Sequence, residues 1–250
     1  MALSGTDRGT YDDTVSDTTT AVSPASNFTP GALAVLCASW NNSESGGSDP
    51  FSSIVDNLGN TWTRRTTALY DPGAANAGIV GGIFTCPQDV APITTSTVIT
   101  LTFSTNVAAS SGTFREMASD AGLVEFVTGD VNAGANTDTP TVTTSSIASG
   151  HAVVGALHAE INLSSLTGDA DTSNGSWSAA QKNGTGVGAA AAATLSQYKV
   201  TTGTATQTFN PTLTAADCIL SWIELQEVVV AFRAPKPLAI LQAVNRASRF

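Results

Sequence analysis

The sequence predicts an all-β fold, an antiparallel β-sandwich built from two similar halves. The first indication is an internal duplication, because the same landmarks recur in the same order along the chain. The separation between paired landmarks falls from 119 residues (Trp40 to Ala159) to 106 residues (Phe103 to Phe209), which indicates shorter loops in the second copy. The pairs are Pro30–Trp40 with Ser149–Ala159, Trp62 with Trp177, Phe84 with Tyr198, Thr100–Ser104 with Thr206–Asn210, and Glu116 with Glu224.

Composition is the second indication. Charged residues make up 12% of the 250 residues, and hydrophobic residues make up 42%. The chain therefore has enough apolar residues for a core and is not typical of a disordered protein. Thr-rich runs such as Thr94–Phe103 suit the half-buried surface of a sheet, where β-branched side chains pack well. A chain of this length can form one large β domain.

The first half-repeat, residues 26–128, is preceded by a polar segment, residues 1–25, for which an extended arm and a first edge strand both remain open. Leu33–Trp40 is apolar on both alternating faces, which predicts a strand in the middle of the core. Ile54–Thr63 is predicted to be a hairpin, because Asp, Asn and Gly stand between β-forming residues. Further strands are predicted over Ile79–Cys86, Thr97–Phe103, Phe114–Met117 and Leu123–Thr128, followed by a linker over Gly129–Pro140.

The second half-repeat, residues 140–228, repeats this order. Residues 184–193 are nearly all Gly and Ala, and fit either a short helix or a close-packed strand. Short strands separated by Gly, Pro, Asn and Asp favour a sandwich of the jelly-roll type over βαβ units, with each half supplying one Greek key. The strands predicted here are Ala152–Ile161, Ser176–Ala179, Leu195–Thr201, Thr204–Phe209 and Cys218–Val230.

Residues 231–250 differ from the rest of the chain. Pro235 and Pro237 predict an extended arm, and the residues from Pro237 onward have the apolar and polar spacing of a short amphipathic helix. A helix this short needs a surface to pack on, which is either the core of the body or a partner. We expect it to anchor the chain to a partner. The expected anchoring residues are Arg233, Lys236, Leu238, Ile240, Leu241, Val244, Arg246, Arg249 and Phe250.

The distribution of charge also changes at residue 231. Residues 1–230 carry six basic and twenty acidic groups, formally −14, whereas residues 231–250 carry +4. A strongly acidic body disfavours binding to nucleic acid and to anionic membranes. No stretch is long and apolar enough for a membrane span, and the polar, acidic residues 1–20 predict no secretory signal peptide. Cys37, Cys86 and Cys218 show no disulfide spacing, and we expect Cys37 and Cys218 to be buried free thiols.

Few residues suggest chemistry. His151 and His158 are seven residues apart, so they should point to opposite faces of a strand, and His158 is expected to form a structural hydrogen bond with Glu160. Asp169–Gly175 resembles the start of a calcium loop, but its glycine comes one place late and the carboxylate at its end is missing, which favours a polar loop tip. We therefore expect no bound metal and no cofactor.

Two further groups have both a structural and a functional interpretation. Glu116 and Glu224 could be imagined as a glycosidase pair, but their matching positions favour one hydrogen-bonded strand end in each half. Four tryptophans could form a platform for sugars, yet Trp62 and Trp177 are equivalent, as expected of residues that seal two similar cores. The sequence therefore does not predict an enzyme. The four tryptophans are Trp40, Trp62, Trp177 and Trp222.

The segment Ser53–Thr63, together with the strand Gly31–Trp40 and the later Thr102, Phe103 and Glu116, resembles the jelly-roll-like β-sandwich modules of phage virion proteins and of some bacterial surface proteins. The resemblance covers about residues 25–228 and leaves out the tail. Such modules serve as decoration, spike, fibre and glycan-binding parts, and the resemblance implies no catalytic residues.

These observations lead to one expected function and several alternatives. We expect a structural protein of a phage-like virion, made in the host cytoplasm: a capsid decoration or cement protein whose tail docks on other virion proteins, foremost the major capsid protein. Self-association of the chain remains open. The main alternative is a glycan- or receptor-binding module of a tail fibre, spike or bacterial surface protein, which would expose tryptophans in a groove. A tail or connector component and a retaining glycosidase are the remaining alternatives.

Overall fold

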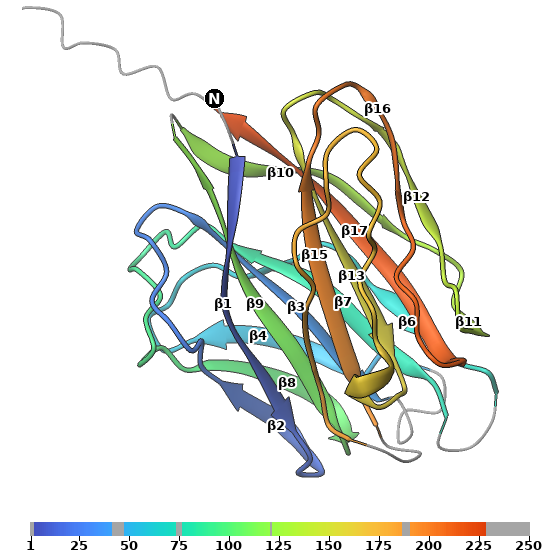
Figure 1. Cartoon of the computed structure of the whole chain (residues 1–250). Helices are drawn as coiled ribbons and strands as arrows, with labels where there is room; N and C mark the ends of the chain where they lie inside the picture. The colour runs from blue at the N-terminus through green and yellow to red at the C-terminus, as the bar shows by residue number, and fades with distance from the viewer. Residues whose placement is uncertain (1–2, 42–47, 74–76, 121, 187–190, 229–250) are drawn as a thin grey trace, which may run out of the picture.

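The structure, a computed structural model, describes residues 3–41, 48–73, 77–120, 122–186 and 191–228. In these ranges the regular secondary structure is β-strand, and the only helical element is a single 3-10 turn, η1 (Leu163–Ser165). All strand pairs are antiparallel (Figure 1). The predicted all-β sandwich is therefore confirmed, while the predicted arm and amphipathic helix of residues 231–250 lie outside the described residues.

The first half forms two sheets. Its strands are β1 (Leu3–Asp13), β2 (Asp17–Val22), β3 (Leu33–Asn41), β4 (Phe51–Asp56), β5 (Thr63–Arg64), β6 (Ala68–Tyr70), β7 (Ile79–Cys86), β8 (Ile99–Val107) and β9 (Ser110–Ser119). The first inner sheet has the order β1-β9-β3-β7-β5, with β6 also paired to β7. The first outer sheet has the order β2-β8-β4.

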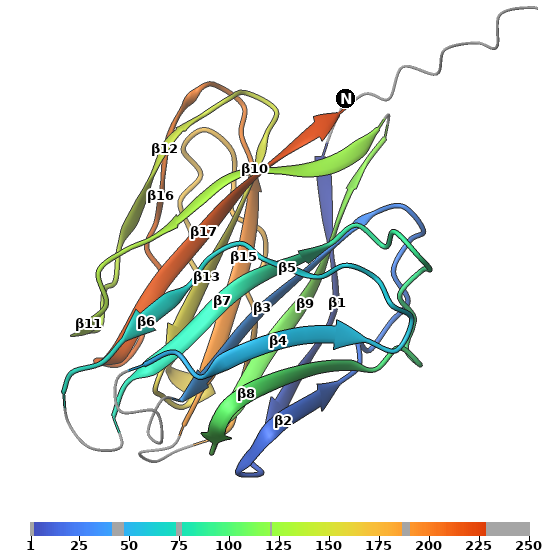
Figure 2. The ribbon, with the colours of Figure 1, turned by 180° about the vertical axis from the view of Figure 1, so that it is seen from behind.

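The second half also forms two sheets. Its strands are β10 (Leu123–Val131), β11 (Ala135–Thr137), β12 (Val142–Ile147), β13 (Ala152–Ala159), β14 (Gln181–Gly184), β15 (Ala193–Val200), β16 (Ala205–Phe209) and β17 (Ala216–Val228). The second inner sheet has the order β10-β17-β13-β15-β14, with β11 also paired to β17, and the second outer sheet consists of β12 and β16. Figure 2 shows β10 and β11 alongside β17.

The four sheets stack with the two inner sheets in the middle. One apolar cluster fills the space between the inner and outer sheets of the first half, a second does the same in the second half, and a third lies between the two inner sheets. Alternation along β3 explains this: Leu36 and Trp40 face the core of the first half, whereas Val35 and Cys37 face the other half. The central strands are buried on both faces, which is why they have no polar alternation.

The predicted duplication appears in the strand order. β3 lies between β7 and β9, and its counterpart β13 lies between β15 and β17. Across the interface β9 packs on β15 and, reciprocally, β17 packs on β7. Such reciprocal contacts are those of an approximate two-fold relation between the halves. Two similar units therefore meet through their inner sheets, and each unit keeps a core of its own.

The N-terminal segment belongs to this architecture. Of the two alternatives for residues 1–25, the structure shows the edge strand: β1 pairs with β9 in the first inner sheet, and β2 pairs with β8 in the first outer sheet. β10 pairs with β17 of the second half, although the sequence places it at the close of the first half. The segment predicted as a linker, Gly129–Pro140, contains the end of β10 and all of β11.

The predicted hairpin over Ile54–Thr63 is wrong. β4 pairs with β8 in the outer sheet, whereas β5 pairs with β7 in the inner sheet, so the chain arches from one layer to the other. The carboxylate of Asp56 causes this path by accepting hydrogen bonds from the backbone N–H groups of Leu58 and Asn60 and from the indole of Trp62. These bonds satisfy the polar groups of the arch, which would remain unpaired without a strand partner.

The second half contains two smaller differences. Ser176–Ala179 is irregular, and β14 begins at Gln181; the side chain and backbone of Ser178 bond to Tyr198 and Gln197 instead of forming a ladder. β12 was not predicted, because its Thr and Ser residues show little hydrophobic alternation. Residues 184 and 193 end β14 and begin β15, and residues 187–190 between them lie outside the described residues.

Candidate functional site

The nine predicted anchoring residues lie outside the described residues, so the structure does not place them. The structure does show where the body ends. β17 ends at Val228, which pairs with Leu123 of β10. The apolar residues Leu123 and Val127 on β10 are 48% and 41% exposed. The end of the sandwich from which residues 229–250 continue therefore carries the exposed apolar side chain of Leu123, with Val127 four residues further along β10. The nine residues are Arg233, Lys236, Leu238, Ile240, Leu241, Val244, Arg246, Arg249 and Phe250.

Glu116 and Glu224 each stabilise a strand end in their own half, as the sequence predicts. The Glu116 carboxylate pairs with Arg8 at 2.7 Å and accepts the backbone N–H of Thr29 at 2.6 Å. Glu224 lies 2.7 Å from Nδ1 of His151. By strand alternation both glutamates point away from the interface, so the two inner sheets lie between them. They cannot form the close carboxylate pair of a retaining glycosidase.

His158 does not bond to Glu160, and this prediction is wrong. Its Nδ1 lies 2.8 Å from the hydroxyl of Ser39 in the first half, and its Nε2 lies 2.9 Å from the hydroxyl of Ser221 on β17. Glu160 instead accepts the backbone N–H of Gly78. The two residues share a face in sequence, but β13 ends at Ala159, so the chain has left the sheet by Glu160. His151 and His158 do lie on opposite faces, as predicted.

A polar seam of buried hydroxyl groups surrounds His158 between the two inner sheets. The Thr194 hydroxyl donates to Ser39 Oγ at 2.6 Å, and Thr113 lies 2.8 Å from Ser196. Burial, together with the positive charge of Arg64, lowers the pKa of His158 to about 3. The ring is therefore neutral near pH 7, and the serine hydroxyls can donate to one ring nitrogen and accept from the other. The geometry gives the seam a structural role, because all its members are buried and bonded to one another.

The Asp169–Gly175 segment is a polar loop tip, as the sequence favours. Its carboxylates are used by the loop itself: Asp169 accepts the backbone N–H groups of Asp171 and Asn210, and Asp171 accepts that of Ser173. The residues that the structure describes contain no cluster of three or more His, Cys, Asp or Glu side chains that could hold a metal ion.

Lys199 contributes a buried cation beneath this loop. Its Nζ is fully buried and lies 3.1 Å from Asp171 and 2.8 Å from the carbonyl oxygen of Ser173, and it sits over the ring of Trp177. The hydrogen bonds from Ser173, followed by the interaction with Lys199, lower the pKa of Asp171 to about 2. Asp171 is therefore ionised at neutral pH, and its side chain is 36% exposed at the surface.

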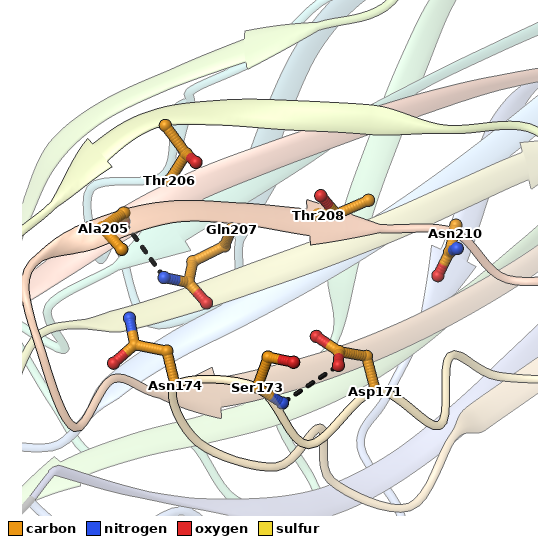
Figure 3. A pocket seen from close by; sticks show the side chains of 8 residues that line it. All are labelled: Asp171, Ser173, Asn174, Ala205, Thr206, Gln207, Thr208 and Asn210. Atoms are coloured by element: carbon orange, nitrogen blue, oxygen red, sulfur yellow. Dashed lines mark hydrogen bonds between the residues drawn. The ribbon is translucent and has the colours of Figure 1, made fainter.

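A cavity of about 470 Å³ opens between this loop and β16 (Figure 3). Its lining is polar and contains no aromatic side chain. In Figure 3 the side chain of Gln207 extends from β16 toward the loop, and Asn174 and Ser173 face it from the other side. The Gln207 amide donates to the carbonyl oxygen of Ala205. The lining residues are Asp171, Ser173, Asn174, Ala205, Thr206, Gln207, Thr208 and Asn210.

A second cavity of about 420 Å³ lies where β1 meets the second half. Its charged groups are paired, because buried Arg115 lies 2.6 Å from Asp7 and stacks over the ring of Tyr198. Gly5 belongs to the same contact, since a Cβ there would collide with Tyr198. This cavity therefore belongs to the joint between the halves, and the cavity beside β16 is the better candidate for a binding site.

The exposed tryptophan groove that a glycan-binding module would use is not formed. Trp40 is fully buried, Trp222 is 3% exposed, and Trp62 and Trp177 are each below 10%. Trp40 packs with Phe51, Phe84 and Phe103 in the core of the first half, beneath the guanidinium of Arg64. The tryptophans seal the cores, as their equivalent positions indicate. The cysteines are also structural, because Cys37, Cys86 and Cys218 are buried and free.

The sequence contains one signal that could have located the arch. Asp56 stands six residues before Trp62, and Asp171 stands six residues before Trp177. In both places the carboxylate accepts the backbone N–H two residues later, at the turn from one layer to the other. An Asp-x5-Trp spacing in both copies is thus the sequence pattern that indicates the arch. The cavity beside β16 has no comparable signal, because it results from a strand that is absent from one copy.

No family model, curated protein or solved structure matches this chain. Within the described ranges there is also no helix long and apolar enough to cross a membrane.

Proposed function

We propose that this chain is a non-enzymatic structural protein of a phage-like virion, a capsid decoration or cement protein that docks on the major capsid protein through residues 231–250. The observation that carries the proposal is the separation of charge, formally −14 on residues 1–230 and +4 on residues 231–250. A cationic, amphipathic tail on an acidic body provides an anchor of opposite sign to the part that faces solvent. Weak tail contacts repeated over many copies would add avidity.

The geometry of the body supports an anchor at one end. β17 ends beside Leu123 of β10, and β1 begins beside Ser119 of β9. The Ser119 hydroxyl also donates to Glu227, which ties these two strand ends together. A C-terminal segment that continues from this end would attach the two-part sandwich to the shell at one end only. Exposed Leu123 would add apolar contact at the same end.

The experiment compares the full chain with a chain that lacks residues 231–250. Both are offered to particles in the producing host, and the copy number relative to the major shell protein is measured in gradient-purified particles. The proposal expects hundreds of copies of the full chain per particle and loss of incorporation on deletion. Circular dichroism and a thermal melt of the shortened chain check that the sandwich remains folded.

Two results would contradict the proposal. Undiminished incorporation of the shortened chain would show that residues 231–250 are not the anchor. A handful of copies per particle would place the protein at the virion's tail or at a capsid vertex. Absence from particles would favour the surface-protein alternative, which a search for glycan or receptor ligands would then test.

A further inference from the structure

The cavity beside β16 borders an open strand edge. β16 pairs with β12 on one side, and its other edge has no strand partner among the described residues. That edge faces the cavity, and the loop Asp171–Asn174 forms the opposite wall (Figure 3). An open edge presents unpaired backbone N–H and C=O groups, which can pair with an extended chain.

The first half shows what fits in this position. There β8, the counterpart of β16, lies between β2 and β4, and Leu101 pairs with Ile54 of β4. Leu101 is equivalent to Gln207, which lines the cavity. In the second half the segment equivalent to β4 makes one isolated bridge, Thr167 with Thr212, which lies beyond the end of β16, and it forms no ladder with β16 itself. The cavity thus occupies the place of a missing strand.

The backbone of β16 is oriented for this pairing. The N–H of Gln207 donates to the hydroxyl of Thr144 on β12, so the Gln207 backbone points to the occupied side. Neighbouring residues of a strand direct their backbone groups to alternate sides. Thr206 and Thr208 therefore direct theirs toward the cavity. An added strand could therefore form hydrogen bonds with the backbone N–H and C=O groups of both Thr206 and Thr208.

We propose that residues 229–234 of a second copy of this chain pair with the open edge of β16. The segment reads Val229-Val230-Ala231-Phe232-Arg233-Ala234, which is rich in strand-forming residues and has no proline before Pro235. Six residues are a common strand length. Recognition would rest on main-chain hydrogen bonds, as in other cases of strand addition to a sheet edge.

Charge also favours this segment. The groups beside the cavity are Asp171, exposed at the rim, with Asp169 and the buried Lys199 behind it. Their formal sum is negative, as is the −14 of the body, whereas Arg233 brings a positive charge. Arg233 would lie on the same face of the added strand as Val229 and Ala231 and would complement Asp171 at the rim.

Strand direction explains why the donor is another molecule. Ala152 of β13 pairs with both Leu225 and Val200, so β15 and β17 end at the same end of the sandwich. β16 follows β15 and runs back from that end. A segment that continued from β17 into the cavity of its own molecule would also run back, parallel to β16. In the first half β4 runs antiparallel to β8, and only a segment that enters from the opposite end reproduces this.

The contact joins two copies and needs no shell protein, so it goes beyond the proposed function. Sedimentation velocity of the full chain over a wide concentration range tests it. We expect concentration-dependent association into dimers and longer head-to-tail chains. Thr208→Pro, which removes the N–H directed at the open edge, should weaken association by about tenfold or more. Thr208→Val keeps that N–H and should associate like the native chain.

A second pair of variants leaves the sandwich untouched. Arg233→Glu should weaken association by about tenfold, whereas Arg249→Glu, the same charge change outside the segment, should not. A chain that stays monomeric at every concentration would overturn the proposal. Equal association of the Thr208→Pro and Thr208→Val proteins, or equal effects of the two arginine changes, would overturn it as well. Thermal melts of all four variants verify folding. Should Thr208→Pro unfold the chain, the comparison of Arg233→Glu with Arg249→Glu tests the proposal by itself.

Discussion

Ser39 Oγ and His158 Nδ1 lie 2.8 Å apart, and these two residues occupy the same position in the two copies of the repeat. Their separation of 119 residues equals the offset between Trp40 and Ala159. Equivalent positions come into contact only close to the axis that relates two units. The Ser39–His158 hydrogen bond therefore marks the centre of the joint between the halves, and it replaces the self-contact that two identical units would have there.

Stability should fall as the pH drops from about 6.5 toward 3, because of His158. Its pKa is lowered to about 3 in the folded chain from an ordinary value of 6.5, so the unfolded state binds a proton that the folded state excludes. In that window the loss is at most about 1.4 kcal/mol per pH unit. Thermal melts at several pH values measure it. His158→Gln should flatten the slope between pH 5 and 6.5, whereas His151→Gln should leave the His158 contribution in place; an unchanged slope in His158→Gln would contradict the assignment.

Gly81→Ala should destabilise the chain by about 1–3 kcal/mol, the usual cost of overpacking a core. A Cβ at Gly81 would collide with the imidazole of His158, which cannot move because serine hydroxyls bond to both ring nitrogens. Urea denaturation measures the change in the free energy of unfolding. Gly203→Ala is the matched control, because its Cβ would meet only the side chain of Asn174, at 3.1 Å. Equal effects of the two changes would show that the seam tolerates displacement of the ring.

Replacing the two equivalent tryptophans by phenylalanine should have unequal effects. The Trp62 indole donates to Asp56 at 3.0 Å, whereas the buried indole nitrogen of Trp177 has no hydrogen-bond partner. Trp62→Phe should therefore cost about 1–3 kcal/mol more than Trp177→Phe, since it removes a hydrogen bond to a buried carboxylate. Chemical denaturation of both variants gives the difference. A cost that is as large for Trp177 would mean that ring size, and not the Asp56 bond, governs both sites.

The three thiols should be unreactive in the folded chain. Burial raises the pKa of Cys37 and Cys86 to about 12 and that of Cys218 to about 11, so thiolate is scarce at neutral pH, and all three side chains are buried. We expect no colour with Ellman's reagent at pH 8 and release of three equivalents in guanidinium. Rapid reaction of one thiol under native conditions would reveal a local opening of the sheet that holds it.

The fold could be predicted because burial of a strand on both faces leaves a simple apolar pattern in the sequence. Leu33–Trp40 and Ile79–Cys86 are apolar on both faces and form central strands, and the landmarks of the duplication other than Trp62 and Trp177 fall on equivalent strands. The predictions were wrong where strand pairing depends on residues far away in the sequence. β10 follows the first half in sequence but pairs with β17, and the turn-forming residues after Asp56 suggest a hairpin unless the Asp-x5-Trp spacing is compared between the two copies.

The predicted hydrogen-bond partner of His158 was also wrong. A residue two places along a strand shares its face, so Glu160 was the natural expectation, whereas Ser39 is 119 residues away. The cavity beside β16 could not be predicted at all. It depends on the segment before Asp171 leaving the sheet, and nothing in the composition of that segment signals the departure.

The position of β17 has a consequence for the order in which the protein folds during synthesis. The first half is complete once β9 has been made, because β1 and β3 both pair with β9. The second inner sheet cannot form until β17, the last described strand, has been made, since β10, β11 and β13 all pair with β17. A nascent chain that pauses before Ala216 would therefore expose the apolar side chains of Leu33, Val35 and Ile83 on a folded first half. Such intermediates attract chaperones and aggregate readily, so the interval before β17 emerges is the vulnerable stage of production.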